Sequence, residues 1–267
     1  MHTMTLRLTL VLACAATVFA QEPPSVVKWP AHSMERPRPK VVAPEYDGQP
    51  VPAPAGAVIL FDGKDLAKWK QDVKKDATDP SDAPKWKLED GYFQVVPGTG
   101  MMRTREAIKG SVHLHIEWAT PSVVKGNSQG RGNSGVFLSG FPELQVLDSW
   151  ENDTYPDGQA GAFYGVNPPL VNASRKPGEW QCYDLLVERA PAADGKPAGK
   201  TQVTVRHNNV LVQDHLPLGG AAQESTLAFQ DHGNPIRFRN IWAAPIPDRK
   251  PGSGPEPQVP AGAKSGQ

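Results

Sequence analysis

The chain has 267 residues, and its 28 basic residues balance its 28 acidic residues, so the formal net charge is zero. This balance excludes the strongly basic surface with which proteins attract nucleic acids or anionic membranes, and it favours a partner that is neutral or small. Proline (28 residues) and glycine (25 residues) are abundant, and the prolines crowd both ends of the chain, which predicts one folded region between extended, solvated segments.

The first 20 residues have the pattern of a secretory signal peptide, with Arg7 before an apolar run and small residues that end at Ala20. The run is too short for a stable membrane-spanning helix, so we expect export to the periplasm or the exterior and no transmembrane span. Cys14 leaves lipoprotein anchoring open as an alternative. Cleavage after Ala20 would leave Cys182 as the only cysteine, so no internal disulfide is expected.

A Pro-rich linker is expected over residues 21–56, and the folded domain over residues 57–246. The domain contains many short segments in which apolar and polar residues alternate, which is typical of strands. One of them alternates His113 and His115 with apolar residues. Because no third ligand follows at a fixed spacing, we expect these to be exposed strand histidines.

Turn signals separate the predicted strands at spacings near ten residues. Asn208-Asn209 stands between two alternating runs, as the turn of a hairpin requires. No stretch of a dozen residues has a convincing helical period. The pattern predicts an all-β fold, an antiparallel two-sheet jelly-roll sandwich, with a disordered tail over residues 247–267.

The stretch "GFPELQVLDSW" places three polar side chains, Glu143, Gln145 and Asp148, in a predicted strand. In a regular strand, Asp148 would lie on the opposite face from the other two. A β-bulge at Val146-Leu147 would return it to their face, and we expect this bulge. The row would then present acid, amide and acid on one concave surface.

Two further motifs and a loop carry polar residues that could take part in catalysis or binding. In "FQDHGNPIRFRNIW", Gln230 precedes His232, which stands at a strand end, and histidine suits proton transfer near neutral pH. In "RGNSGVFLSG", Arg131 and Asn133 lead into a strand. The long loop after the acidic row contains Tyr164, and such loops are often functional, so this residue could line the rim of a site.

The segment "ELQVLD" resembles the bulged acid row of laminarinase-like glucanases, with Gln145 in place of the central Asp and Asp148 in place of the last Glu. Glutamine cannot raise the pKa of a neighbour by like charge, and aspartate is one methylene shorter, so a standard double-displacement glycosidase is not expected. The alternative without chemistry is a solvated strand face with an acidic edge, in which His232 is merely hydrogen bonded in its loop.

Six segments together resemble one family, the 3-keto-disaccharide hydrolase domain: "RGNSGVFLSG", "ELQVLDS", "YPDGQAGAFYG", "PPLVNASRKPGEWQ", "VTVRHNNVLVQDH" and "QDHGNPIRFRNIW". The resemblance covers about Val58 to Ile246. It implies a β-sandwich of the concanavalin A-like lectin and glucanase type, export, and action on glycosides already oxidised to a ketone at sugar C3. It also implies that the family's polar positions lie on the concave face, and these are Glu143, Asp148, Gln230, His232 and Asn133 in this sequence.

A C3 ketone acidifies the C2 proton, so one base can remove that proton and the C1 aglycone can leave by elimination. We therefore predict an exported enzyme that cleaves 3-keto-glycosides, as a hydrolase or as a lyase. The predicted catalytic residues are Glu143, His232 and Asp148. The predicted substrate-binding residues are Arg131, Asn133, Gln145, Tyr164 and Gln230.

No motif indicates a cofactor, but a divalent metal held by Glu143 and His232 stays open. Two other functions also stay open. One is a non-catalytic or laminarinase-like glycan-binding module on the same sandwich. The other is an interaction module that uses its Pro-rich ends in a larger envelope assembly.

Overall fold

A computed structural model of the protein describes residues 29–73, 81–189, 200–218 and 223–247. For residues 192–193 and 196–197 it describes the backbone only. The expected signal peptide, with Cys14, and the expected tail beyond Pro247 lie outside the described residues. None of the helices in the described part of the chain is long and apolar enough to cross a membrane. The one cysteine that the structure describes, Cys182, is buried and forms no disulfide.

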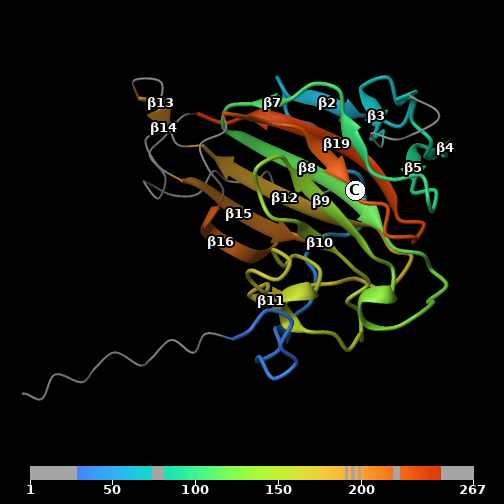
Figure 1. Ribbon diagram of the computed structural model, residues 1–267, viewed down its shortest axis with the longest axis vertical. Coiled ribbons are helices and arrows are strands. Elements are labelled where there is room, and N and C mark those ends of the chain that lie inside the picture. The colour runs from blue at the N-terminus through green and yellow to red at the C-terminus, as the bar shows by residue number, and fades with distance from the viewer. Residues whose placement is uncertain are drawn as a thin grey trace, which may run out of the picture.

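Two antiparallel sheets form the body of the protein (Figure 1). The larger sheet runs in the order β16 (Val210–Leu218), β15 (Thr201–His207), β12 (Gln181–Glu188), β8 (Val112–Ala119), β19 (Arg237–Pro245), β5 (Tyr92–Gln94) and β4 (Lys87–Glu89), with β2 (Val58–Phe61) also paired to β19. The smaller sheet runs in the order β10 (Leu144–Val146), β9 (Ser134–Leu138), β18 (Leu227–Phe229), β6 (Met102–Thr104) and β3 (Trp69–Gln71).

Three two-stranded pairs and two short helices accompany these sheets in the described part of the chain. The two-stranded pairs are β1 (Lys40–Val41) with β11 (Val171–Asn172), β7 (Ile108–Lys109) with β17 (Glu224–Ser225), and β13 (Ala192–Ala193) with β14 (Lys196–Pro197). Two single-turn 3-10 helices, η1 (Ser128–Gly130) and η2 (Pro156–Gly158), lie in loops. The predicted hairpin turn joins β15 to β16, and its two residues, Asn208 and Asn209, have φ of 53° and 67°.

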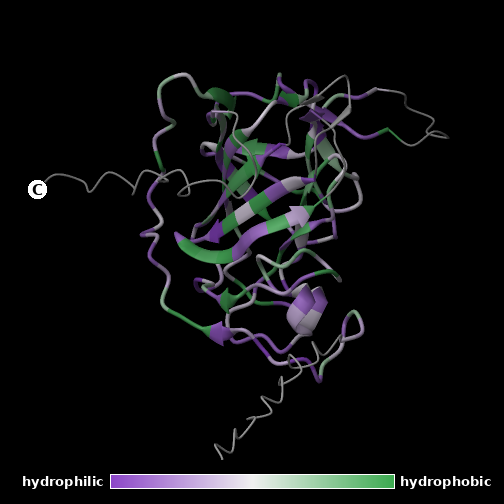
Figure 2. Ribbon diagram, turned by 90° about the vertical axis from the view of Figure 1, so that its left-hand side faces the viewer, coloured by the Kyte–Doolittle hydropathy of each residue, from purple (hydrophilic) through white to green (hydrophobic). Residues whose placement is uncertain are grey.

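Aromatic side chains from both sheets fill the core. Phe229 of β18 stacks on Phe238 of β19 with ring centroids 4.1 Å apart, and Trp69 of β3 lies 5.4 Å from Phe229. Burying one such side chain contributes about 1.5–3 kcal/mol. Hydrophobic and hydrophilic residues alternate along the strands, which gives each sheet one core face (Figure 2). The predicted antiparallel two-sheet sandwich is confirmed.

The described part of the predicted linker, residues 29–56, packs on the sandwich instead of running through solvent. β1 pairs with β11 in parallel. The N–H of Val51 donates to Glu117 Oε1 at 2.8 Å, and Arg239 donates to the Gly48 carbonyl oxygen at 2.7 Å. Tyr46 is buried. Hydrogen bonds to the sheet, rather than a large apolar area, hold this segment in place.

The expectation that His113 and His115 are exposed is wrong, because residues 29–56 help to cover their face of β8. Both side chains are buried, and each has a ring nitrogen 2.8 Å from Asp184 Oδ1. His115 also lies 3.3 Å from Glu117 Oε1. Burial lowers the pKa of His115, but the carboxylates of Asp184 and Glu117 outweigh it and raise the pKa to about 9.

Candidate functional site

The outer face of the smaller sheet carries polar residues of the predicted site. On β9 and β10, Val136 and Val146 belong to the core, while Gly135 and Gln145, which pair across the two strands, alternate to the opposite face. The N–H of Gln230 donates to the Gly135 carbonyl oxygen at 3.0 Å, so Gln230 extends this row just past the end of β18. Gln145 and Gln230 therefore flank Gly135.

Glu143 leans over Gly135 on this outer face. A Cβ atom on residue 135 would lie 2.1 Å from Glu143 Oε1, so the glycine leaves the space that the carboxyl group occupies. Glu143 is half-buried, and burial raises its pKa to about 7. A carboxyl group with this pKa can take or give a proton near neutral pH.

The loop between β10 and β11 covers Gln145 and forms a wall beside it. Gln145 Nε2 donates to Gln129 Oε1 at 2.8 Å. Gln129 Nε2 in turn donates to Thr154 Oγ1 at 2.7 Å and to the Gly158 carbonyl oxygen at 2.9 Å. Gln129 thus fixes the loop against the side-chain amide of Gln145. No signal in the sequence predicts this role of Gln129.

Two tyrosines of the same loop stand next to Glu143. The N–H of Tyr164 donates to the Glu143 carbonyl oxygen at 2.9 Å, and the hydroxyls of Tyr155 and Tyr164 are hydrogen bonded to each other. Burial, the bond to Tyr164 and, less strongly, the Glu143 carboxylate raise the pKa of Tyr155. The phenol of Tyr155 therefore stays neutral at physiological pH.

Three buried amide oxygens around this face accept no hydrogen bond from the described residues: Gln145 Oε1, Gln230 Oε1 and Asn133 Oδ1. The Asn133 side chain is held in place, since its Nδ2 donates to the Gln129 carbonyl oxygen at 2.6 Å. Buried acceptors in native proteins usually have a partner. Each of these oxygens is thus a buried acceptor to which the described residues supply no donor.

Asp148 lies on the other face of the sheet from Glu143, so the predicted bulge is wrong. After the regular pairing of β10 with β9 up to Val146, the N–H of Asp148 donates to the Gly132 carbonyl oxygen at 3.1 Å, in the same register. A Cβ atom on Gly132 would be 3.1 Å from both Asp148 Cβ and Thr120 Cβ, and Thr120 follows β8 of the larger sheet. The Asp148 side chain therefore faces the larger sheet at the end of the sandwich.

Arg131 neutralises Asp148 at this position. Arg131 Nε lies 2.6 Å from Asp148 Oδ2, and its NH2 donates to the Trp150 carbonyl oxygen at 2.8 Å. Burial raises the pKa of Asp148, while Arg131 opposes the rise. The two residues line a cavity of about 290 Å³ together with Asn234. The Asp148 carboxylate of this ion pair faces the opposite side of the smaller sheet from Glu143.

His232 lies in the loop that follows β18 and is exposed to solvent. The loop is fixed on both sides of it. Asp231 Oδ2 accepts from the N–H of Gly100 at 3.0 Å, and Asn234 Oδ1 accepts from the N–H of Asn133 at 2.6 Å. His232 is thus two residues beyond Gln230, on an anchored loop, with its ring open to solvent.

The structure brings part of the predicted set together. The outer face of the smaller sheet brings together Glu143, Gln145, Gln230 and Tyr164. Asn133 lies next to this group, because its side chain and that of Gln145 both donate to Gln129. Arg131 and Asp148 do not join them. In the described residues, no three His, Cys, Asp or Glu side chains converge in a way that could hold a metal ion.

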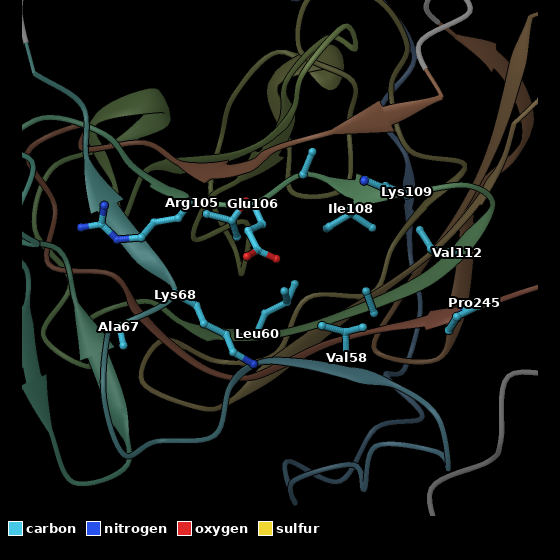
Figure 3. Close-up of a pocket in the computed structure, with 13 residues that line it drawn as sticks. Val58, Leu60, Ala67, Lys68, Arg105, Glu106, Ile108, Lys109, Val112 and Pro245 are labelled. Carbon is cyan, nitrogen blue, oxygen red and sulfur yellow. The ribbon is translucent and has the colours of Figure 1, made fainter.

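Two larger cavities contain none of the predicted site residues. One, of about 650 Å³, lies beside Asp72 and Asp231 at the ends of β3 and β18. The other, of about 510 Å³, opens between β2 and the loop after β6, where Lys68, Arg105 and Glu106 surround apolar side chains (Figure 3). Val112 lines it, so it lies at the opposite end of β8 from Thr120 and Asp148.

Comparisons with known proteins agree with the fold. The chain is 27% identical over 254 residues to a protein of Bacteroides thetaiotaomicron named 3-keto-disaccharide hydrolase, covering 74% of this chain and 82% of that protein. A solved structure named as a glycosyl hydrolase of Parabacteroides distasonis is 37% identical, with a TM-score of 0.64, over 79% of this chain and 93% of that chain. A second one from the same organism, at 20% identity and a TM-score of 0.53, shares the fold over 74% of this chain and all of that chain.

The sequence model of one family matches residues 56–244, which is most of the chain and nearly all of the sandwich. The 37% identity to the first Parabacteroides structure extends over a similar share of the chain. The protein therefore belongs to the family described as the 3-keto-alpha-glucoside-1,2-lyase-like domain.

Proposed function

We propose that this protein is an exported enzyme that cleaves the glycosidic bond of 3-keto-glycosides on the outer face of the smaller sheet. At the coarser level, its family and relatives make it a carbohydrate-cleaving protein. The observation that carries the finer proposal is Glu143, one carboxyl group with a pKa of about 7 beside unpaired amide oxygens. The apolar run within residues 1–20 supports export.

The surroundings of Glu143 suit elimination better than an ordinary glycosidase mechanism. Retaining and inverting glycosidases flank the bond with two carboxyl groups, about 5–9.5 Å apart. Here the only other acid of the row, Asp148, faces the larger sheet and is paired with Arg131. A substrate that already carries a C3 ketone needs one base at C2 and one proton for the leaving oxygen, so a single working carboxyl group is sufficient.

Glu143 takes the proton from C2, and the C2–H electrons form an enolate whose charge lies on the C3 ketone oxygen. As the enolate returns to the ketone, a C1=C2 double bond forms and the C1–O bond breaks. His232 gives a proton to the departing aglycone oxygen. In a lyase the reaction ends there, and in a hydrolase water then adds across the C1=C2 double bond, with its oxygen bonding to C1 and a proton returning to C2. The side-chain amides of Gln145 and Gln230 bind sugar hydroxyls and stabilise the enolate that develops on the ketone oxygen.

Two variants of this scheme use the same residues. In the first, His232 is the base and Glu143 the acid, because a carboxyl group with a pKa of about 7 serves either role. In the second, Glu143 and His232 would hold a divalent metal, which would polarise the ketone and so acidify the C2 proton. Both retain Glu143 as the residue on which turnover depends.

The test is release of the aglycone from a 3-keto-glucoside and from its unoxidised parent, with the purified protein at equal concentrations. We expect release from the 3-keto-glucoside alone. Release from both compounds would indicate an ordinary glycosidase. Binding without release from either would indicate a glycan-binding module, and both outcomes would contradict the proposal.

A further inference from the structure

One aromatic side chain beside the candidate site comes from outside the part of the chain that the family model matches. His32 precedes residues 56–244 by more than twenty positions. Its ring lies 4.5 Å, between centroids, from Tyr155 and 4.9 Å from Tyr164. The three rings form one cluster, which we call the aromatic rim.

The protein holds His32 in this place by specific contacts. The N–H of His32 donates to both carboxylate oxygens of Asp157, at 3.2 and 3.0 Å, and Asp157 is fully buried in η2. Arg36 of the same segment lies 4.0 Å from Asp157 Oδ2. A Cβ atom on Gly165 would be 3.2 Å from His32 Nε2, so the glycine leaves room for the ring.

The aromatic rim adjoins the reacting carboxyl group and is open to solvent. The N–H of Tyr164 donates to the Glu143 carbonyl oxygen, and the hydroxyls of Tyr155 and Tyr164 are hydrogen bonded to each other. His32 is exposed, and both tyrosines are half-buried. A ligand that places its reacting carbons at Glu143 can therefore extend onto these rings.

We propose that His32, Tyr155 and Tyr164 form the subsite for the aglycone, and that this aglycone is a second sugar ring. The proposal rests on the proposed function, because it assumes that a 3-keto sugar reacts at Glu143. Aromatic faces pack against the C–H faces of a sugar ring, and the phenol hydroxyls can bond its hydroxyl groups. The N-terminal segment is then a specificity-determining part of the enzyme.

The experiment compares two substrates, a 3-keto-disaccharide and the 3-keto derivative of methyl glucoside, which has almost no aglycone. His32→Asn removes the ring and suits the left-handed φ of 62° at this residue. We expect KM for the disaccharide to rise by about three- to tenfold with kcat nearly unchanged, while the methyl glycoside is unaffected. Met34→Ala, an exposed change in the same segment, should have no effect.

The outcomes separate this proposal from the proposed function. If the wild type turns over both substrates, and His32→Asn either leaves both KM values unchanged or raises them equally, the subsite proposal is overturned and the proposed function is not. No turnover by the wild type overturns the proposed function. In that case calorimetric titration with the unoxidised disaccharide decides about the rim, since equal affinity of wild type and His32→Asn overturns it and weaker binding by the variant supports it.

Discussion

The raised pKa of Glu143 depends on the absence of a side chain at its neighbour, Gly135. Gly135 leaves the volume into which the carboxyl group folds, and the burial that results raises the pKa to about 7. An exposed glutamate would be ionised at neutral pH and a weak base. The sequence motif "RGNSG" is therefore part of the acid–base site, although Gly135 itself carries no reactive group.

Replacing Gly135 by alanine should displace Glu143 without unfolding the sheet. Residue 135 does not have a left-handed φ, so alanine suits its backbone, but its Cβ would meet Glu143 Oε1 at 2.1 Å. We expect kcat/KM to fall by about 10- to 100-fold, because small displacements of a reacting group have effects of this size. Gly130→Ala is the matched control, since its Cβ would meet no atom within 4 Å, and it should leave the rate unchanged. Equal rates of Gly135→Ala and wild type would remove Glu143 from the reaction.

At the scale of elements, β10 shows which features the sequence predicts. Alternation predicts the strand and places Glu143 and Gln145 on one face, as the structure has them. Alternation also places Asp148 on the opposite face, as the structure has it, whereas the predicted bulge, which would have turned Asp148 outward and Leu147 inward, is wrong. The loop after β10 covers the outer face instead, so Leu147 is fully buried without a bulge. The alternation of residues within a strand does not predict whether a loop covers its outer face.

The N-terminal segment is a second element whose place the local sequence does not predict. Its low apolar content predicts a solvated linker, but hydrogen bonds hold its described part. The Val51 carbonyl oxygen accepts from Asn240 Nδ2 at 2.7 Å and from Trp242 Nε1 at 3.3 Å. These partners lie almost two hundred residues away along the chain. Composition reports apolar burial well and specific long-range hydrogen bonds poorly.

For the molecule as a whole, alternation and turn residues suffice to predict two antiparallel sheets, because each strand has to bury one face. The turn at Asn208 and Asn209 is confirmed for the same local reason. Alternation and turn residues do not predict the buried charged residues that lie beneath the N-terminal segment. His115, Asp184 and Glu117 form a buried network there that depends on strand neighbours and on residues 29–56.

This network should make the global stability depend on pH. The pKa of His115 is about 9 in the folded protein and about 6.5 when unfolded, so the stabilisation is complete below pH 6.5 and is lost as pH rises through 9. We expect the free energy of unfolding, measured with urea, to fall over this window by on the order of 2 kcal/mol. His115→Gln should abolish this slope.

A buried histidine without carboxylate partners provides the control. Burial lowers the pKa of His207 to about 3, so this residue stays neutral throughout the same window. His207→Gln should lower stability at every pH but keep the slope between pH 6.5 and 9. A wild-type stability that is flat over this window would contradict a charged His115.

The central claim is that Glu143 is the working acid–base residue and that Asp148 is not. The most direct measurement is the rate of aglycone release from a 3-keto-glucoside by Glu143→Gln and by Asp148→Asn, each in its folded form. We predict that Glu143→Gln lowers the rate by about 10²- to 10⁴-fold, the usual contribution of a general acid or base. Asp148→Asn should stay close to the wild-type rate. The reverse pattern, with Asp148 essential and Glu143 dispensable, would contradict the account.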